Sequence, residues 1–314
     1  MLTLSQNTKR TSLHRFEPLS QIVIYGANGW LGRSAIASAM QLQSMWPDLS
    51  LLLIGSKPSR LAIDGKVFDI QAQAAAAPLI QRDCLFLNAA FLRREKLFGM
   101  SYNKYIDENA QISSFALEQI KSNRVQYFIN LSSGAAKPYD LKSVSLTEDP
   151  YGSLKFLWEK EFEEACRVRN INFLNCRIYS ILGRFINEFD NLAISSFFLQ
   201  SLEEKSIIVE APNCRRTYVD AEQLVTLLFK LVLQAKSMRI DSGGTLTTLE
   251  SLAMTVLEVL NLESGKLIRG NSISADYFGD YEQFNSLCDA MEIGLLDINA
   301  QVKKTSIAFN QVDK

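Results

Sequence analysis

Three side chains in the middle of the sequence have the types and the spacing of a proton-transfer site. Tyr151 and Lys155 are four residues apart in the segment 151–169, which is predicted to be a helix, so they share one face of it. A phenol titrates at about 10, and a cation one turn away favours the phenolate, which makes the phenol usable as a general acid or base. Ser133 follows the apolar run 126–131, and its hydroxyl can polarise a substrate oxygen. Alone, this Tyr–Lys spacing also occurs in ordinary surface pairs, so its meaning depends on the elements around it.

A glycine-rich turn near the start of the chain supplies the second part of such a site. The apolar run 21–25 is followed by Gly26-Ala27-Asn28-Gly29-Trp30-Leu31-Gly32, and the segment 33–42 after it has helical character. Gly26 permits the turn, Gly29 lets backbone amides approach a pyrophosphate, and Gly32 allows the helix to pack closely on the strand. An incidental glycine-rich turn is the alternative, but the flanking strand and helix favour a dinucleotide site.

Apolar runs alternate with helical segments over the first half of the chain. The predicted strands are 21–25, 49–54, 66–70, 84–88, 126–131 and 172–179, and the predicted helices include 103–121 and 151–169. Continuous apolar strands joined by connections long enough for crossover helices indicate an α/β fold with a doubly wound, Rossmann-type parallel sheet.

The domain organisation follows from the same alternation. Residues 20–182 are expected to form the dinucleotide-binding domain, and residues 183–314 a smaller mixed α/β substrate lobe, with about 216–240 returning to the first domain. Residues 1–19 are expected to be a flexible tail.

Composition excludes several classes of function. Of the 314 residues, 47% are hydrophobic and 21% charged, and the formal charge of −1 gives no reason to expect nucleic acid or an anionic membrane as partner. The only histidine is His14, so neither a Ser-His-Asp triad nor a multi-histidine metal site is expected. The five widely spaced cysteines suit a reducing compartment, and no apolar run is long enough to span a membrane, so we expect a cytoplasmic protein without a metal.

The end of the second predicted strand bears on coenzyme choice. NAD-selective sites place a carboxylate there, whereas this chain has Ser56 and Lys57, followed by Arg60, and Arg33 follows the last glycine. Hydroxyl groups and cations suit a 2′-phosphate, so NADP is preferred over NAD. The alternative is that these are solvated loop residues.

Together these motifs resemble the extended short-chain dehydrogenase/reductase superfamily, in particular the NAD(P)-dependent epimerase/dehydratase family, which acts on nucleotide sugars. The resemblance covers residues 20 to 306. It implies that Tyr151, Lys155, Ser133 and Asn109 are catalytic. It implies dinucleotide contacts from Gly26, Ala27, Asn28, Gly29, Trp30, Leu31, Gly32, Arg33, Ser56, Lys57, Asp69, Ile70, Asn88, Ala89, Ala90, Lys155 and Tyr179, and substrate contacts from Ser133, Ser180 and Arg216, the last to a diphosphate. It also implies a homodimer formed through segments 103–121 and 151–169.

Departures from the family pattern narrow the reaction. Gly134 and Ala135 follow Ser133 where the family's 4,6-dehydratases carry an Asp-Glu pair, so a dehydratase is disfavoured. The identity of the substrate stays open for two reasons. The gap between Ser133 and Tyr151 is shorter than is usual in the family, and the family usually has other residues at the positions of Ser180, Arg184 and Gln223. A 4-ketoreductase of a nucleotide sugar is favoured, because the preferred coenzyme is NADP, whereas the family's epimerases keep bound NAD. The alternatives are a 4-epimerase with bound NAD, a reductase of another hydroxy-ketone, and a non-catalytic NAD(P)-binding regulatory protein.

Overall fold

The computed structural model describes residues 19–122, 124–187, 192–203, 206–234, 237–263 and 266–309. His14 and nearly all of the expected tail lie outside these ranges. Within them, no helix is both long and apolar enough to cross a membrane. The same ranges contain no cluster of three His, Cys, Asp or Glu side chains arranged to hold a metal ion.

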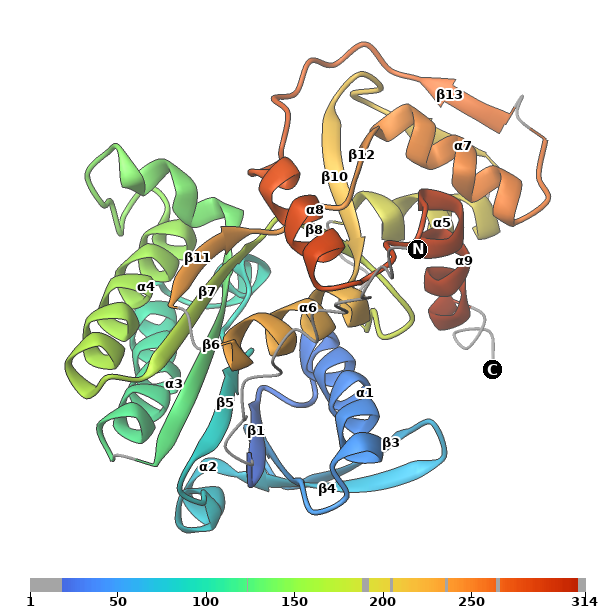
Figure 1. Ribbon diagram of the computed structural model, residues 1–314. Coiled ribbons are helices and arrows are strands. Elements are labelled where there is room, and N and C mark those ends of the chain that lie inside the picture. Colours follow the sequence, from blue (N-terminus) through green and yellow to red (C-terminus); the bar gives the residue numbers. More distant parts are fainter. Residues whose placement is uncertain are drawn as a thin grey trace, which may run out of the picture.

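An eight-stranded sheet forms the centre of the molecule (Figure 1). Its strands are β1 (Gln21–Tyr25), β2 (Ser50–Gly55), β3 (Ser59–Ile63), β4 (Lys66–Ala72), β5 (Cys84–Asn88), β6 (Val125–Ser133), β7 (Asn172–Ile178) and β11 (Met238–Asp241). They lie in the order β11-β7-β6-β5-β1-β2-β4-β3, and every neighbouring pair is parallel except β3 with β4. The predicted doubly wound α/β fold is therefore confirmed.

Helices cover both faces of this sheet, which is why its central strands are apolar throughout. In Figure 1, α1 (Trp30–Met45) and α6 (Ala221–Leu233) lie together on one face, and α3 (Tyr102–Lys121) and α4 (Pro150–Arg169) on the other. Strand β1 alternates between the two cores, with Ile22 and Ile24 in the first and Val23 and Tyr25 in the second. Helices α1, α3 and α4 each come after the carboxyl end of a strand of this sheet, namely β1, β5 and β6.

The second half of the chain builds a smaller lobe from two short sheets and several helices. Its elements are β8 (Ser180–Leu182), α5 (Ala193–Glu203), β9 (Ile207–Val209), β10 (Arg215–Asp220), β12 (Thr245–Thr248), α7 (Leu249–Val259), β13 (Leu267–Arg269), α8 (Tyr281–Ala290) and α9 (Ile298–Phe309). The sheets have the orders β12-β10-β8 and β13-β9. A separate apolar core holds the lobe together, and in it the rings of Phe198 and Phe309 stack with centroids 4.5 Å apart.

The connections between the first strands differ from the sequence-based expectation. No crossover helix joins β2 to β4. Instead, Ser59–Ile63 forms β3, which pairs with β4 as an antiparallel hairpin at the edge of the sheet. Asp64 and Gly65 turn this hairpin with φ angles of 49° and 77°, as a two-residue type I′ turn requires. Between β4 and β5 the chain forms only the four-residue α2 (Gln73–Ala76) and the 3-10 turn Ala77–Leu79.

Candidate active site

The glycine turn after β1 is built so tightly that only glycine fits two of its positions. Gly26 has a φ of +92°, and a Cβ added there would lie 2.7 Å from the carbonyl carbon of Ala89 at the end of β5. A Cβ on Gly32 would lie 2.2 Å from the carbonyl oxygen of Gly26. The carbonyl of Asn28 between them accepts hydrogen bonds from Arg33 Nε (3.1 Å) and Asn187 Nδ2 (3.0 Å). The turn therefore has one conformation, fixed by packing on both sides.

Substituting Gly32 with Ala is expected to weaken both folding and dinucleotide binding. The methyl group would contact backbone atoms of Gly26 and Ala27 that cannot rotate away, and such overpacking costs about 1–3 kcal/mol. Urea denaturation and a dinucleotide titration would measure the two effects. Gly99 offers the matched control, because a Cβ there meets no atom within 4 Å. Equal effects of the two substitutions would contradict this account of the turn.

The start of α1 has the donors that a pyrophosphate needs. Gly29 is the N-cap residue, makes no side-chain capping bond, and the first turn carries no acidic residue. A Cβ at Gly29 would meet only the Gly26 carbonyl oxygen, at 3.4 Å, so the backbone is open on that side. Uncapped N–H groups at the positive end of a helix bind phosphate groups. These residues fit the dinucleotide that the sequence predicts.

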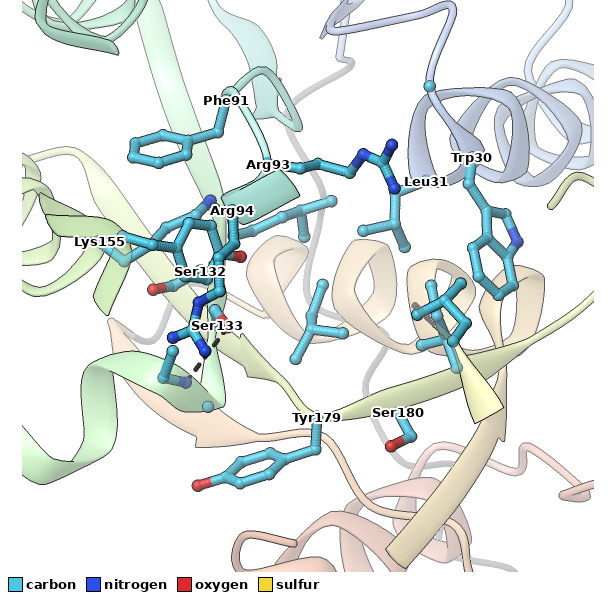
Figure 2. A pocket seen from close by; sticks show the side chains of 18 of the residues that line it. Trp30, Leu31, Phe91, Arg93, Arg94, Ser132, Ser133, Lys155, Tyr179 and Ser180 are labelled. Carbon is cyan, nitrogen blue, oxygen red and sulfur yellow. Dashed lines mark hydrogen bonds between the residues drawn. The ribbon is translucent and has the colours of Figure 1, made fainter. Parts of the chain in front are cut away.

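A cleft of about 650 Å³ opens beside this helix start, between the large sheet and the smaller lobe (Figure 2). It brings together many residues that the sequence predicted for the site. Those that line it are Gly29, Trp30, Leu31, Gly32, Ala89, Ser133, Tyr151, Lys155, Tyr179, Ser180 and Arg216. Side chains for a dinucleotide and for proton transfer therefore share one cavity.

Other predicted residues do not line the cleft. They are Gly26, Ala27, Asn28, Arg33, Ser56, Lys57, Asp69, Ile70, Asn88, Ala90 and Asn109. Asn109 is fully buried, where its Oδ1 accepts from Leu92 N (2.8 Å) and its Nδ2 donates to Tyr105 O (3.0 Å). It therefore fixes the segment after β5 that enters the cleft. Asn88 is the first of three buried asparagines linked across β5, β6 and β7 by side-chain hydrogen bonds through Asn130 to Asn175.

Asp69, which the resemblance implied to contact the dinucleotide, lies outside the wall of the cleft. It lies in the middle of β4, is mostly exposed, and forms an ion pair of 3.0 Å with Arg60 on the edge strand β3. Asp69, Ile70 and Arg60 border a separate small hollow. Because β3 forms a hairpin, Arg60 is held by Asp69, while Ser56 and Lys57 remain exposed at the end of β2.

Tyr151 and Ser133 reach the cleft from adjoining elements. Asp149 caps α4 by accepting from Gly152 N at 3.2 Å, and this places Tyr151 in the first turn. Ser133 ends β6, where its hydroxyl accepts from Ala135 N at 3.2 Å. Burial raises the pKa of Tyr151 to about 12, and Ser133 acts in the opposite direction. The phenol is therefore protonated at neutral pH.

The contacts of the Lys155 ammonium are to groups other than Tyr151. Its ammonium donates to Leu131 O at 3.0 Å and lies 4.1 Å from the centre of the Phe91 ring, which covers it (Figure 2). Burial lowers the pKa of Lys155 to about 7, and Glu159 opposes the shift. Arg94, whose guanidinium carbon lies 5.3 Å from the centre of the phenol ring, lowers the pKa of Tyr151.

The lowered pKa of Lys155 predicts a pH-dependent stability. Between about pH 7 and pH 10.5 the unfolded chain holds this proton and the folded protein does not, so the free energy of unfolding rises with pH in that window. Lys155→Met removes the contribution. The free energy of unfolding of the variant minus that of the wild type should be largest at or below pH 7. Above pH 7 this difference should fall by up to about 1.4 kcal/mol per pH unit. Urea denaturation between pH 6 and about pH 9.5 tests this, and a constant difference would contradict it.

A buried ionic network behind the cleft was not anticipated from the sequence. Glu159 and Arg177 are both fully buried, with Arg177 NH2 2.7 Å from Glu159 Oε2. Ser132 also donates to Glu159, and Asp140 accepts from both terminal nitrogens of Arg177, at 2.5 Å from Nη1 and 2.9 Å from Nη2. The network joins α4, β6 and β7 directly beneath Ser133 and Lys155. The spacing of Glu159, four residues after Lys155, was the available signal.

Three polar atoms on the wall of the cleft are buried without a partner in the described part of the chain. They are Trp30 Nε1, Arg216 Nε and Tyr218 OH. Unpartnered buried donors are costly, so they indicate a polar ligand. Tyr277 also lines the cleft, and its ring lies 4.9 Å, centroid to centroid, from that of Tyr179 at a tilt of 52°. Sequence reasoning gave no role to Tyr218, although it lies two residues after the predicted substrate residue Arg216, nor to Tyr277, which stands in no recognisable motif.

A protein-family model covers most of this architecture. The model of the NAD dependent epimerase/dehydratase family matches residues 22–241, from β1 to the end of β11. The chain belongs to this family. The match contains every strand of the large sheet and both segments that carry Ser133 and Tyr151, so the resemblance stated from the sequence is confirmed. The comparison with curated proteins finds no match.

Solved structures show the same fold as this family member at low sequence identity. A UDP-N-acetylglucosamine 4-epimerase from Methanobrevibacter ruminantium, in complex with UDP-N-acetylmuramic acid, is 15% identical with a TM-score of 0.73, over 94% of this chain and 99% of that one. A UDP-glucuronic acid 4-epimerase from Bacillus cereus, in complex with NAD, is 15% identical with a TM-score of 0.68, over 94% and 100%. A dTDP-glucose 4,6-dehydratase from Bacillus anthracis, in complex with NAD, is 12% identical with a TM-score of 0.68, over 93% and 96%.

Proposed function

We propose that this family member is an NAD(P)-dependent oxidoreductase that reduces the 4-keto group of a nucleotide sugar. The observation that carries the proposal is the shared cleft, in which a protonated phenol, Tyr151, and the hydroxyl of Ser133 face the space beside the glycine turn. A dinucleotide bound there supplies the hydride. Tyr151 donates a proton to the ketone oxygen, and Ser133 donates a hydrogen bond to the same oxygen as negative charge develops on it.

The remaining residues of the cleft hold the two ligands. The N–H groups of the first turn of α1 bind the pyrophosphate of the coenzyme, and Lys155 donates to the nicotinamide ribose. Arg216, whose Nε lacks a protein partner in the described ranges, binds the diphosphate of the substrate together with Trp30 and Tyr218. Ser180 and Tyr179 border the sugar at the point where the chain passes from β7 to β8.

We propose NADP as the preferred coenzyme. Strand β2 ends in Gly55, and the exposed Ser56 and Lys57 that follow provide no carboxylate to bind a ribose 2′-hydroxyl. Asn28 Nδ2 and Ser59 Oγ, 3.3 Å apart, add neutral polar groups at this point. A 2′-phosphate would be bound by Lys57 and by Arg33 at the start of α1. Competing titrations of NADP and NAD measure the preference, and tighter binding of NAD would overturn it.

A 4-epimerase with bound NAD is the second candidate. It is favoured by the 4-epimerases found among the structures with the same fold, of which the enzyme from Bacillus cereus described above is in complex with NAD. We also propose a cytoplasmic location, because all five cysteines are free and buried. We propose that the protein is a homodimer formed through α3 and α4, which pack together on one side of the sheet. Light scattering tests the dimer, and a monomer at micromolar concentration would exclude it.

The experiment that separates the two activities uses the purified full chain with a panel of nucleotide sugars and 4-keto sugars. A reductase consumes NADPH in proportion to the keto sugar, which is followed by the absorbance of the reduced nicotinamide. An epimerase purified with NAD interconverts two sugars without net consumption of coenzyme, which chromatography detects. Dinucleotide binding without turnover of any sugar would support a regulatory protein and refute both enzymatic proposals.

A further inference from the structure

Arg94 is a charged residue beside Tyr151 that has no role in the proposed reaction. It begins the 3-10 segment Arg94–Gly99 after β5, and its guanidinium carbon lies 5.3 Å from the centre of the Tyr151 ring. Its side chain is 53% exposed, so a ligand in the cleft can reach it. Figure 2 shows Arg94 extending toward Ser133, with Trp30 on the opposite side of the cavity.

The contacts of Arg94 leave most of its donors available. One of its N–H groups binds Asp149 Oδ1 at 3.2 Å, and no other hydrogen bond of its guanidinium to the described residues is found. Asp149 does not depend on Arg94, because it also accepts from Gly152 N and from Tyr139 OH. The guanidinium can therefore turn to a ligand without leaving a carboxylate unpaired.

Basic side chains outnumber acidic ones among the described residues that line the cleft. The basic ones are Arg93, Arg94, Lys155 and Arg216, and the acidic ones are Glu95 and Asp149. Arg93 forms an ion pair with Glu95 and Arg94 with Asp149. Arg216 is proposed to bind the diphosphate of the substrate. Arg94 is thus a second anion-binding group, placed beside the phenol rather than at the diphosphate.

We propose that Arg94 recognises a carboxylate on the sugar, so that the substrate is a nucleotide-linked acidic sugar such as a hexuronate. This inference rests on the proposed function. In a hexuronate the carboxyl carbon C6 is two bonds from C4, so a sugar whose C4 oxygen meets Tyr151 presents its carboxylate close to that phenol. Guanidinium binds carboxylate through two parallel hydrogen bonds, which a neutral hydroxymethyl group cannot match.

The test compares matched substrate pairs that differ only at C6, UDP-glucose with UDP-glucuronate and GDP-mannose with GDP-mannuronate. Calorimetry measures their binding to the full chain loaded with dinucleotide, and chromatography measures turnover. The wild type should favour the acidic member of the pair it accepts by about 10- to 100-fold in Kd. Arg94→Gln should remove this preference and leave the affinity for the neutral member within about threefold, and Arg94→Lys should be intermediate. Arg167→Gln, which removes an exposed charge at the far end of α4, is the matched control.

Two results would overturn the inference while the proposed function stands. One is binding of a nucleotide sugar by the wild type without preference for the acidic member. The other is an equal loss for both members in Arg94→Gln, which would show that Arg94 acts on Tyr151 and not on the substrate. If no nucleotide sugar binds although the dinucleotide does, the proposed function itself fails, and this inference with it.

Discussion

Replacing Tyr151 with Phe should lower kcat about 10²- to 10⁴-fold while the protein still binds its dinucleotide. The substitution removes only the hydroxyl, and the ring keeps its edge-on contact with Phe91, whose centroid is 5.9 Å away. The proton for the substrate oxygen would then have to come from water or from Ser133, whose hydroxyl is a much weaker acid. Steady-state kinetics on the accepted substrate, together with a dinucleotide titration, measure both parts of the prediction.

The pH profile distinguishes proton transfer from a structural effect. Burial raises the pKa of Tyr151 to about 12 in the described structure, so the wild-type phenol can serve as an acid across the whole neutral range. The residual activity of Tyr151→Phe should therefore depend on pH differently from that of the wild type. Tyr277→Phe is the comparison variant, since it removes a second phenol from the same cleft. If the two variants lose activity equally, the special role of Tyr151 is refuted.

The sequence predicted the elements of the large sheet well because their signals are local. Strands β1 and β5 begin and end at the predicted residues, since an apolar run marks each of them. The hairpin of β3 and β4 was missed although Asp64-Gly65 is a strong turn signal, because the charged residues before it were interpreted as a coenzyme loop. In the structure Arg60 of that segment forms an ion pair with Asp69 at the edge of the sheet.

The candidate site was predicted where motifs mark it and missed where distant segments meet. The glycine turn, Ser133, Tyr151 and Lys155 line one cleft as expected. The electrostatic environment was not predictable, because it depends on how deeply each group is buried and on side chains from other elements. Phe91 and Arg94 come from the segment after β5, where nothing in the sequence indicates that one covers Lys155 and the other faces Tyr151.

The buried network beneath the cleft predicts the largest change in stability. Arg177→Met should lower the free energy of unfolding by about 3–5 kcal/mol, because it leaves the carboxylate of Glu159 buried without its cation. Glu159 would retain only the hydrogen bond from Ser132, while Asp140 is partly exposed and can be hydrated. Urea denaturation of the wild type and the variant at one pH measures the loss.

A double substitution separates the ionic contribution from lost packing. Glu159→Gln keeps the size of the side chain and removes its charge, so Arg177→Met combined with Glu159→Gln should be more stable than the sum of the single changes predicts, by about 1–3 kcal/mol. Arg167→Gln, which breaks an exposed ion pair with Glu164 on the same helix, should leave stability unchanged. Strict additivity would mean that Glu159 and Arg177 stabilise the protein independently. The network would then not be the element that fixes α4, and with it Lys155 and Tyr151, against the end of β6.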